Sequence, residues 1–249
     1  SPDRVHVFRR IVSRNRLALG ATGLVLLALV TGAGIAVFEA RTAARQRDRA
    51  LVQLQRAEAT NDLTGFLLSE ATPSVGRPIT NAELLARGEA LVDRRFAGNP
   101  VLRVHMLLIL AERYHENGQF DRWQATLDRA FEMSRGIGDV GLRSRAACAQ
   151  AYSLVEQGRQ VEADELLALA LRDVAPLPDA APDEQYCRVF EADVANQRGH
   201  AARAVAAAER AVALRDEESG SAGRDFEALF ALATAYMVAE RYGPADRVY

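Results

Sequence analysis

Lysine is absent from the 249-residue chain, so all 31 of its lysine-plus-arginine positions are arginine. This absence excludes a P-loop lysine, the lysine that anchors ATP in kinases and any Schiff-base lysine from these residues. The formal net charge of −2 gives no reason to expect nucleic-acid binding, because a duplex-binding domain usually carries a marked basic excess. The sequence therefore disfavours several enzyme classes and a nucleic-acid partner.

Cysteine and histidine are also scarce. The two cysteines are too few for a disulfide framework and have no C-x-x-C spacing. The chain contains no H-E-x-x-H or G-x-S-x-G motif. The four histidines do not form a close ligand set by sequence; they are His6, His105, His115 and His200. We therefore expect no metal site, no catalytic residue and no bound cofactor in this part of the protein.

One long run carries no charged residue, from Leu17 to Phe38. As a helix it would cover the ~30 Å hydrocarbon core of a bilayer. A cleaved signal peptide and a buried core helix are the alternatives. The run is longer than a typical signal-peptide core, and its glycines weaken a water-soluble helix. We therefore predict a single transmembrane helix over 17–38.

Arginines flank the run on both sides and favour a cytoplasmic N-terminus only slightly, with 1–16 as a basic juxtamembrane segment. Ala28, Gly32 and Ala36 recur at intervals of four residues. On a helix they form a stripe of small side chains through which two copies could dimerise, although small residues are common in such spans.

The segment after the run, 39–71, contains no proline and is rich in arginine, glutamine and glutamate. Its apolar positions do not sustain the heptads of a coiled coil. We predict a charged connecting helix that ends at Thr72-Pro73, because the residue before a proline is disfavoured in the helical region.

The rest of the chain, 72–249, is internally repetitive. Four similar segments align on Gly118, Gly158, Gly199 and Glu240, at spacings of 40, 41 and 41 residues. The pattern of each segment predicts two helices joined at the aligned residue. The predicted helix pairs span about 104–133, 144–173, 185–214 and 226–249. The fold class predicted for the whole chain is all-α: a transmembrane helix, a long juxtamembrane helix and an α-solenoid.

Each segment resembles a tetratricopeptide repeat. Small residues lie where the first helix of a pair must pack closely, at Ala111, Ala151, Ala192 and Ala233. Three positions depart from the repeat pattern. Trp123 stands where a small residue is usual on the second helix, Glu191 occupies a normally apolar position, and Ala195 replaces an aromatic residue.

The resemblance implies a concave groove built from the first helix of each pair. Its mixture of acidic and aromatic residues suits a protein partner with basic or apolar side chains better than a terminal carboxylate, which needs several cations. The alternative is an ordinary solvated helix face. The groove positions are His105, Leu108, Glu112, His115, Glu116, Arg145, Cys148, Tyr152, Glu156, Tyr186, Val189, Asp193, Asn196, Gln197, Phe230, Thr234 and Met237.

Cys148 and Cys187 fall on the first helices of neighbouring repeats. They could form a disulfide in an oxidising compartment. The commoner arrangement, given the strict distance requirement of a disulfide, is two separately buried thiols, and we expect that arrangement here.

The order "FRRIVSRNR", apolar run, "EARTAARQRDRA", "RAEATND" and "ELLARGEALVDRRFAGNPVLR" resembles the non-kinase half of bacterial transmembrane serine/threonine protein kinases with C-terminal tetratricopeptide repeats. The resemblance implies a single-pass protein of the bacterial inner membrane, with repeats in the periplasm and a cytoplasmic kinase domain before Ser1. ATP and Mg would belong to that domain alone, because no kinase motif occurs in this chain.

The first residue is not methionine and the last lies inside a helix, so we expect further chain at both ends. Three functions remain open. The chain is the anchor and protein-docking sensor of a receptor-like kinase, a membrane-tethered scaffold or chaperone-like protein, or the sensor half of a transmembrane winged-helix regulator. Partners expected are a protein or peptide in the groove, the membrane and a second copy, with no nucleic acid.

Overall fold

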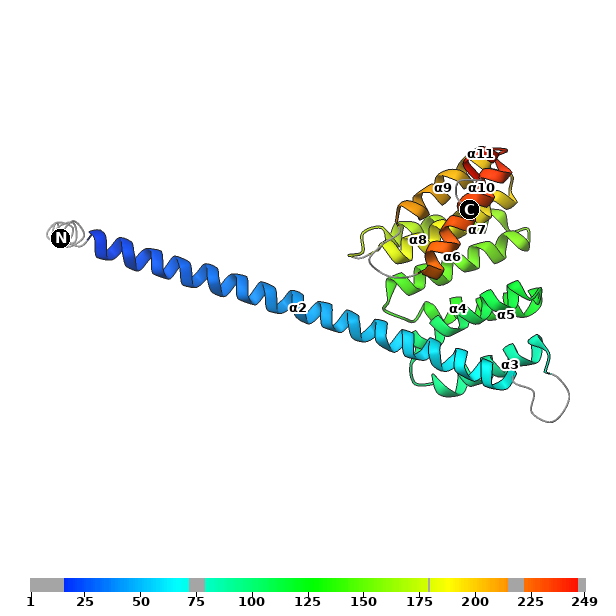
Figure 1. Cartoon of the computed structure of the whole chain (residues 1–249), viewed down its shortest axis with the longest axis horizontal. Coiled ribbons are helices and arrows are strands. Elements are labelled where there is room, and N and C mark those ends of the chain that lie inside the picture. The colour runs from blue at the N-terminus through cyan, green and yellow to red at the C-terminus, as the bar shows by residue number, and fades with distance from the viewer. Residues whose placement is uncertain (1–15, 72–78, 179, 215–221, 246–249) are drawn as a thin grey trace. The chain divides into compact units, whose positions relative to one another are not determined.

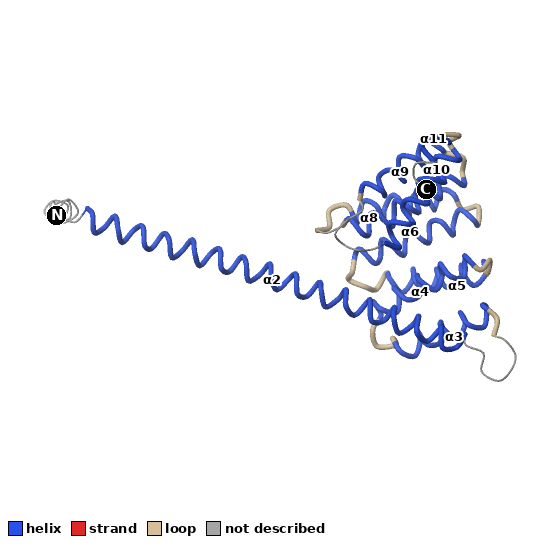
Figure 2. The backbone as a smooth tube through the Cα atoms, in the orientation of Figure 1, coloured by secondary structure: helices blue, strands red, loops and turns tan. Residues whose placement is uncertain are grey.

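The structure, a computed structural model, describes residues 16–71, 79–178, 180–214 and 222–245 (Figure 1). Within these ranges every regular element is an α-helix and no strand occurs (Figure 2). The all-α prediction is therefore confirmed for the described part of the chain. The chain divides into two compact units, Ser1–Ala57 and Glu58–Tyr249.

Helix α2 (Arg16–Ala71) begins in the first unit and ends in the second. The sequence has no proline between Pro2 and Pro73, so no proline removes a backbone hydrogen bond within this helix. The helix ends directly before Thr72-Pro73, where the sequence predicted its end.

Among the side chains that the structure describes, none of the helices is both long and apolar enough to cross a membrane. The transmembrane helix expected over 17–38 is therefore not found among the described side chains. The described side chains of that run extend from Leu29 to Phe38 and are followed by Glu39, whereas those of 17–28 lie outside the described residues.

The expected dimer stripe falls on the same segment. The side chain of Ala28 lies outside the described residues, and Gly32 and Ala36 are exposed on α2. A Cβ added at Gly32 would have no atom within 4 Å. The basic segment before the helix, 1–15, also lies outside the described residues.

The second unit contains α3 (Asn81–Arg95) followed by four helix pairs (Figure 1). The four predicted repeats fall on these pairs, and the first helix of each pair has 17 residues. The pairs are α4 (Pro100–Glu116) with α5 (Phe120–Ser134), α6 (Val140–Glu156) with α7 (Gln160–Val174), α8 (Ala181–Gln197) with α9 (Ala201–Ala213), and α10 (Ala222–Val238) with α11 (Tyr242–Ala245).

Three of these helices begin at side chains that cap the backbone. Thr80 starts α3 in a capping box with Glu83, and Asn99 and Asp139 accept a hydrogen bond from a first-turn N–H of α4 and α6. Such caps fix where each helix starts, and with it the residues that face the core.

The turn inside each pair has the same backbone conformation. Gly118, Gly158 and Gly199 have φ of 68°, 76° and 70°, and Glu240 has φ of 57°. After each of them the next N–H donates to the carbonyl five residues earlier, as in Arg159 to Leu154 at 2.8 Å. This is the Schellman arrangement, in which glycine has no Cβ to clash. The register found by alignment thus coincides with one repeated turn.

Gly158→Ala should lower the free energy of unfolding by about 1 kcal/mol, because an alanine must adopt the left-handed conformation there. The matched control is Gly98→Ala. Gly98 does not have a positive φ, and an added Cβ would have no neighbour within 4 Å. Urea unfolding followed by circular dichroism measures both. Equal stability of the two variants would contradict the role assigned to the turn.

The small residues that the repeat pattern predicts lie at the contacts between helices. Ala111, Ala151, Ala192 and Ala233 are all 0% exposed. Glu191, which departs from the pattern, is also buried, and its carboxylate accepts hydrogen bonds from Arg188 Nη1 and Arg203 Nε at 2.7 and 3.2 Å. Charge-assisted bonds therefore satisfy a carboxylate at a position that is usually apolar.

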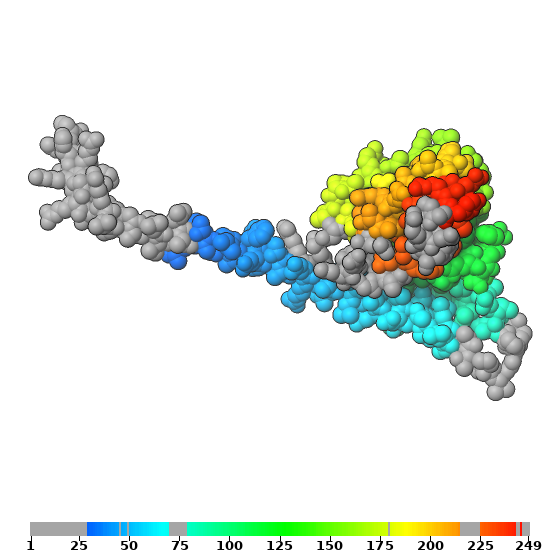
Figure 3. All heavy atoms as spheres, turned by 45° about the horizontal axis from the view of Figure 1, so that its top comes forward, coloured from blue at the N-terminus to red at the C-terminus, as the bar shows by residue number. Residues whose placement is uncertain are grey.

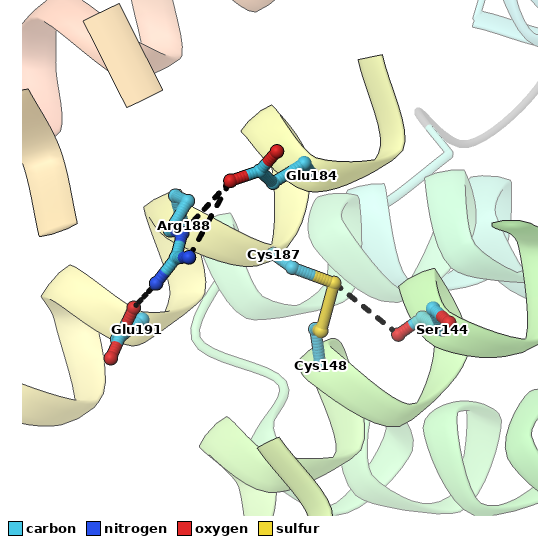
Figure 4. Close-up of a disulfide and its surroundings, with 6 residues drawn as sticks. All are labelled: Ser144, Cys148, Glu184, Cys187, Arg188 and Glu191. Carbon is cyan, nitrogen blue, oxygen red and sulfur yellow. Dashed lines mark hydrogen bonds and ion pairs between the residues drawn. A yellow bond between two sulfur atoms is a disulfide. The ribbon is translucent and has the colours of Figure 1, made fainter. Parts of the chain in front are cut away.

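Cys148 on α6 and Cys187 on α8 form a disulfide, with their Cα atoms 5.3 Å apart (Figure 4). The expectation of two separately buried thiols was wrong. Helices α6 and α8 pack directly against each other, which brings both cysteines to one buried contact. Cys187 Sγ lies 3.5 Å from the carbonyl oxygen of Ser144. Cys148 therefore belongs to the interior and not to the groove where the repeat register placed it.

Candidate functional site

A cavity of about 300 Å³ lies along the first helices of the repeats. Helices α4, α6, α8 and α10 pack against one another in that order, and each contributes to the wall together with α5. In the space-filling view, the part of the chain from α4 to α11 is closely packed (Figure 3). The lining residues are Leu108, Glu112, His115, Glu116, Trp123, Leu127, Ala149, Tyr152, Tyr186, Val189, Phe190, Asp193, Glu227, Phe230 and Ala231.

The structure brings nine of the predicted groove residues together in this cavity. They come from all four first helices, which are far apart in the sequence but adjacent in the fold. They are Leu108, Glu112, His115, Glu116, Tyr152, Tyr186, Val189, Asp193 and Phe230.

The other predicted groove residues lie outside the cavity wall. Gln197 Nε2 donates to Tyr152 Oη at 3.3 Å and to Glu156, and so borders the wall. Both amide atoms of Asn196 are buried without a hydrogen-bond partner among the described residues. The remaining ones are His105, Arg145, Thr234 and Met237, of which Met237 is exposed and the others are half-buried.

Six lining residues were missed by sequence reasoning. Trp123 and Leu127 come from α5, a second helix, whereas the repeat register considered only first helices. The sequence did offer a signal for Trp123, because this residue stands where the repeat pattern has a small one. A ring of that size cannot fit wholly within the contact between the two helices of the pair. The other four are Ala149, Phe190, Glu227 and Ala231.

Aromatic rings form a continuous chain along the cavity. His115 lies 4.7 Å from Trp123 between ring centroids, and Trp123 lies 5.7 Å from Tyr152. Phe190 continues the chain at 6.0 Å from Tyr152 and 4.9 Å from Tyr186. These are tilted or edge-to-face arrangements, the stable geometries of aromatic pairs. The rings link α4 and α5 through α6 to α8 and give the cavity one apolar, preformed side.

Carboxylates occupy the same cavity and are perturbed by it. Burial, together with the charge of Glu227, raises the pKa of Glu112 to about 7 although Arg145 and the Tyr186 hydroxyl lower it. Burial and the charge of Glu227 also raise the pKa of Asp193 to about 7. Both carboxyl groups therefore change charge near neutral pH, unlike ordinary surface carboxyls.

Tyrosine hydroxyls and one arginine adjoin these carboxylates. Tyr186 Oη donates to Glu112 Oε1 at 3.0 Å, and burial raises the pKa of Tyr186 above its ordinary value. Burial, Asp193 and Glu156 raise the pKa of Tyr152 to about 12. The Arg145 guanidinium lies 4.3 Å from the Tyr186 ring centroid. In the described part of the chain no arginine lines the cavity itself.

The Asp193→Asn variant tests whether Asp193 titrates near neutrality. Between pH 3.8, the ordinary pKa of an aspartate, and about pH 7, Asp193 carries a proton in the folded state but not in the unfolded state. The free energy of unfolding therefore falls as the pH rises through this range. From pH 6 to pH 8 the wild type should therefore lose about 1 kcal/mol more than the variant. Urea unfolding at both pH values measures this. Asp173→Asn on α7 is the control, and identical pH profiles for wild type and Asp193→Asn would contradict the shift.

The described residues contain no cluster of three or more histidine, cysteine, aspartate or glutamate side chains that could hold a metal ion. The cavity combines aromatic rings that contact one another with carboxylates that line the same space. Such a wall is chemically suited to an apolar or positively charged group.

No protein-family model and no curated protein matches the chain. Among solved structures it is similar to the crystal structure of BtubC (BKLC) from P. vanneervenii. That similarity has 17% sequence identity and a TM-score of 0.44, and it covers 67% of this chain and 68% of the other.

Proposed function

We propose that the helical repeat unit docks a protein or peptide partner in the groove centred on this cavity. One observation carries the proposal: four first helices converge on a preformed cavity whose wall joins a chain of aromatic rings to several carboxylates. Aromatic side chains that bury large areas with little loss of freedom dominate protein-binding surfaces. A volume of about 300 Å³ accommodates one or two side chains of a bound segment.

The test is selection of binding peptides from a displayed random library against the full 249-residue chain. Selected peptides should lose at least ~10-fold in affinity for the Tyr152→Ala and Asp193→Arg variants, because both change the cavity wall. Glu165→Arg changes the charge as much as Asp193→Arg does, but on the exposed face of α7, and should bind normally. Peptides that bind all variants alike would count against docking in the groove.

We also propose the cellular setting that the family resemblance implies: a receptor-like serine/threonine kinase of the bacterial inner membrane, with its kinase domain before Ser1 in the cytoplasm and the repeats in the periplasm. The uncharged run 17–38 between arginine-rich flanks supports this. So does the disulfide, since disulfides persist in oxidising compartments. The scaffold and winged-helix alternatives share these features.

A reporter fusion tests this setting. Alkaline phosphatase, which is active only after export, is fused after Tyr249 in the full-length protein, and the membranes are extracted with carbonate. Phosphatase activity that stays in the extracted membrane supports a periplasmic repeat unit on a spanning helix. An inactive reporter, or release of the protein by carbonate, would rule the topology out.

A further inference from the structure

We propose that the cavity receives one arginine side chain of the docked partner, with its guanidinium placed against the aromatic rings and paired with Asp193. This inference rests on the proposed docking function and specifies the group that the groove recognises.

The carboxylates have unused acceptor capacity. Within the part of the chain that the structure describes, Asp193 makes no hydrogen bond and no ion pair, although it lines a cavity that withdraws it from water. Glu112 uses Oε1 to accept from Tyr186, and no described group donates to its Oε2. A desolvated carboxylate is unfavourable without a partner. A positively charged donor that enters the cavity beside Asp193 would supply that partner.

The charges around the cavity favour a cation over an anion. Glu112, Glu116, Asp193 and Glu227 all line it, and Glu116 is already paired with Arg113 Nη1 at 2.6 Å. The charge of Glu227 disfavours ionisation of Glu112 and Asp193. Arg145 and Arg113 are the basic groups that lower the pKa of Glu112, and neither of them lines the cavity. An incoming cation relieves the repulsion between the carboxylates, whereas a ligand carboxylate would add to it.

The rings select guanidinium over ammonium. A guanidinium is planar and weakly hydrated, so it stacks on aromatic faces and pairs with a carboxylate in two-pronged geometry, whereas an ammonium remains strongly hydrated. The chain itself places the Arg145 guanidinium 4.3 Å from the Tyr186 ring centroid. On the cavity side, Tyr152 and Phe190 lie 6.0 Å apart between centroids and line the same space as Asp193.

The experiment titrates the full chain at pH 8 with four acetylated and amidated pentapeptides of sequence Leu-Ala-X-Ala-Leu. The third residue is arginine, lysine, citrulline or norleucine. Citrulline keeps the shape of arginine without its charge, and norleucine keeps only an apolar side chain. Trp123, the one tryptophan of the chain, lines the cavity and reports binding by its fluorescence.

The arginine peptide should bind at least ~10-fold more tightly than the citrulline and norleucine peptides and more tightly than the lysine peptide. Asp193→Asn should remove most of the difference between arginine and citrulline, whereas Glu165→Gln on the exposed face of α7 should keep it. Circular dichroism of each variant establishes that it is folded.

The remaining outcomes separate this inference from the docking proposal. Equal binding of the arginine and citrulline peptides, or of the arginine and lysine peptides, would overturn guanidinium recognition and leave docking in place. Guanidinium recognition would also be overturned if the arginine peptide does not bind at up to millimolar concentration while the peptides selected from the library still require Tyr152. If no selected peptide depends on the groove, both proposals fail.

Discussion

Replacing Cys148 and Cys187 together by alanine should lower the free energy of unfolding by about 4 kcal/mol. The disulfide closes a loop between residues 39 apart, and a cross-link of that length removes much of the freedom of the unfolded chain. Both cysteines are 0% exposed, so the variant also leaves two small gaps between α6 and α8. Urea unfolding under non-reducing conditions measures the difference.

Reduction provides the matched control for this prediction. Dithiothreitol should bring the wild type close to the stability of the double variant, and it should leave the double variant unchanged. Alanine is preferred to serine, because a buried hydroxyl without a partner would add its own cost. Equal midpoints of the oxidised wild type and the double variant would contradict a stabilising disulfide.

Trp123→Ala should lower the free energy of unfolding by about 3–5 kcal/mol, the usual cost of deleting a buried aromatic side chain. Trp123 is 4% exposed and lies against His115 and Tyr152. The repeat pattern alone leads to the opposite expectation, because the equivalent residues of the next two repeats are alanines that are fully buried, Ala163 and Ala204. Circular dichroism must follow the unfolding, since the variant has no tryptophan.

Trp123→Phe is the control for this substitution. It keeps an aromatic ring beside His115 and Tyr152 and removes less volume, so its loss of stability should be clearly smaller. A Trp123→Ala protein as stable as the wild type would mean that the first repeat closes around a small residue as the second and third do. In that case the wall of the cavity would not depend on the tryptophan.

The repeat fold could be predicted from the sequence because its signals are local. Gly118, Gly158 and Gly199 mark a backbone conformation that other residues rarely adopt, and buried alanines mark close helix contacts. Glu240 lies in the same conformation without being glycine, and only its spacing from the other three indicated its place. Helix starts were less visible, since they depend on individual capping side chains such as Asn99.

The candidate site was predictable only in part. Groove positions taken from first helices found Glu112, Tyr152 and Asp193, but Trp123 reaches the cavity from a second helix. The disulfide was missed for a related reason. Sequence placed both cysteines on neighbouring helices, whereas the rotation of α6 against α8 decides whether their side chains meet. Such rotations are set by packing across the whole contact and not by any one residue.

The covalent link between α6 and α8 also limits how the solenoid can open. It holds the second repeat to the third at Cys148 and Cys187, so the two helices cannot separate at that point. Among the described residues, the contacts of α4 with α6 and of α8 with α10 carry no such cross-link. A partner that widens the groove should therefore move the α4 wall or the α10 wall more readily than it parts α6 from α8.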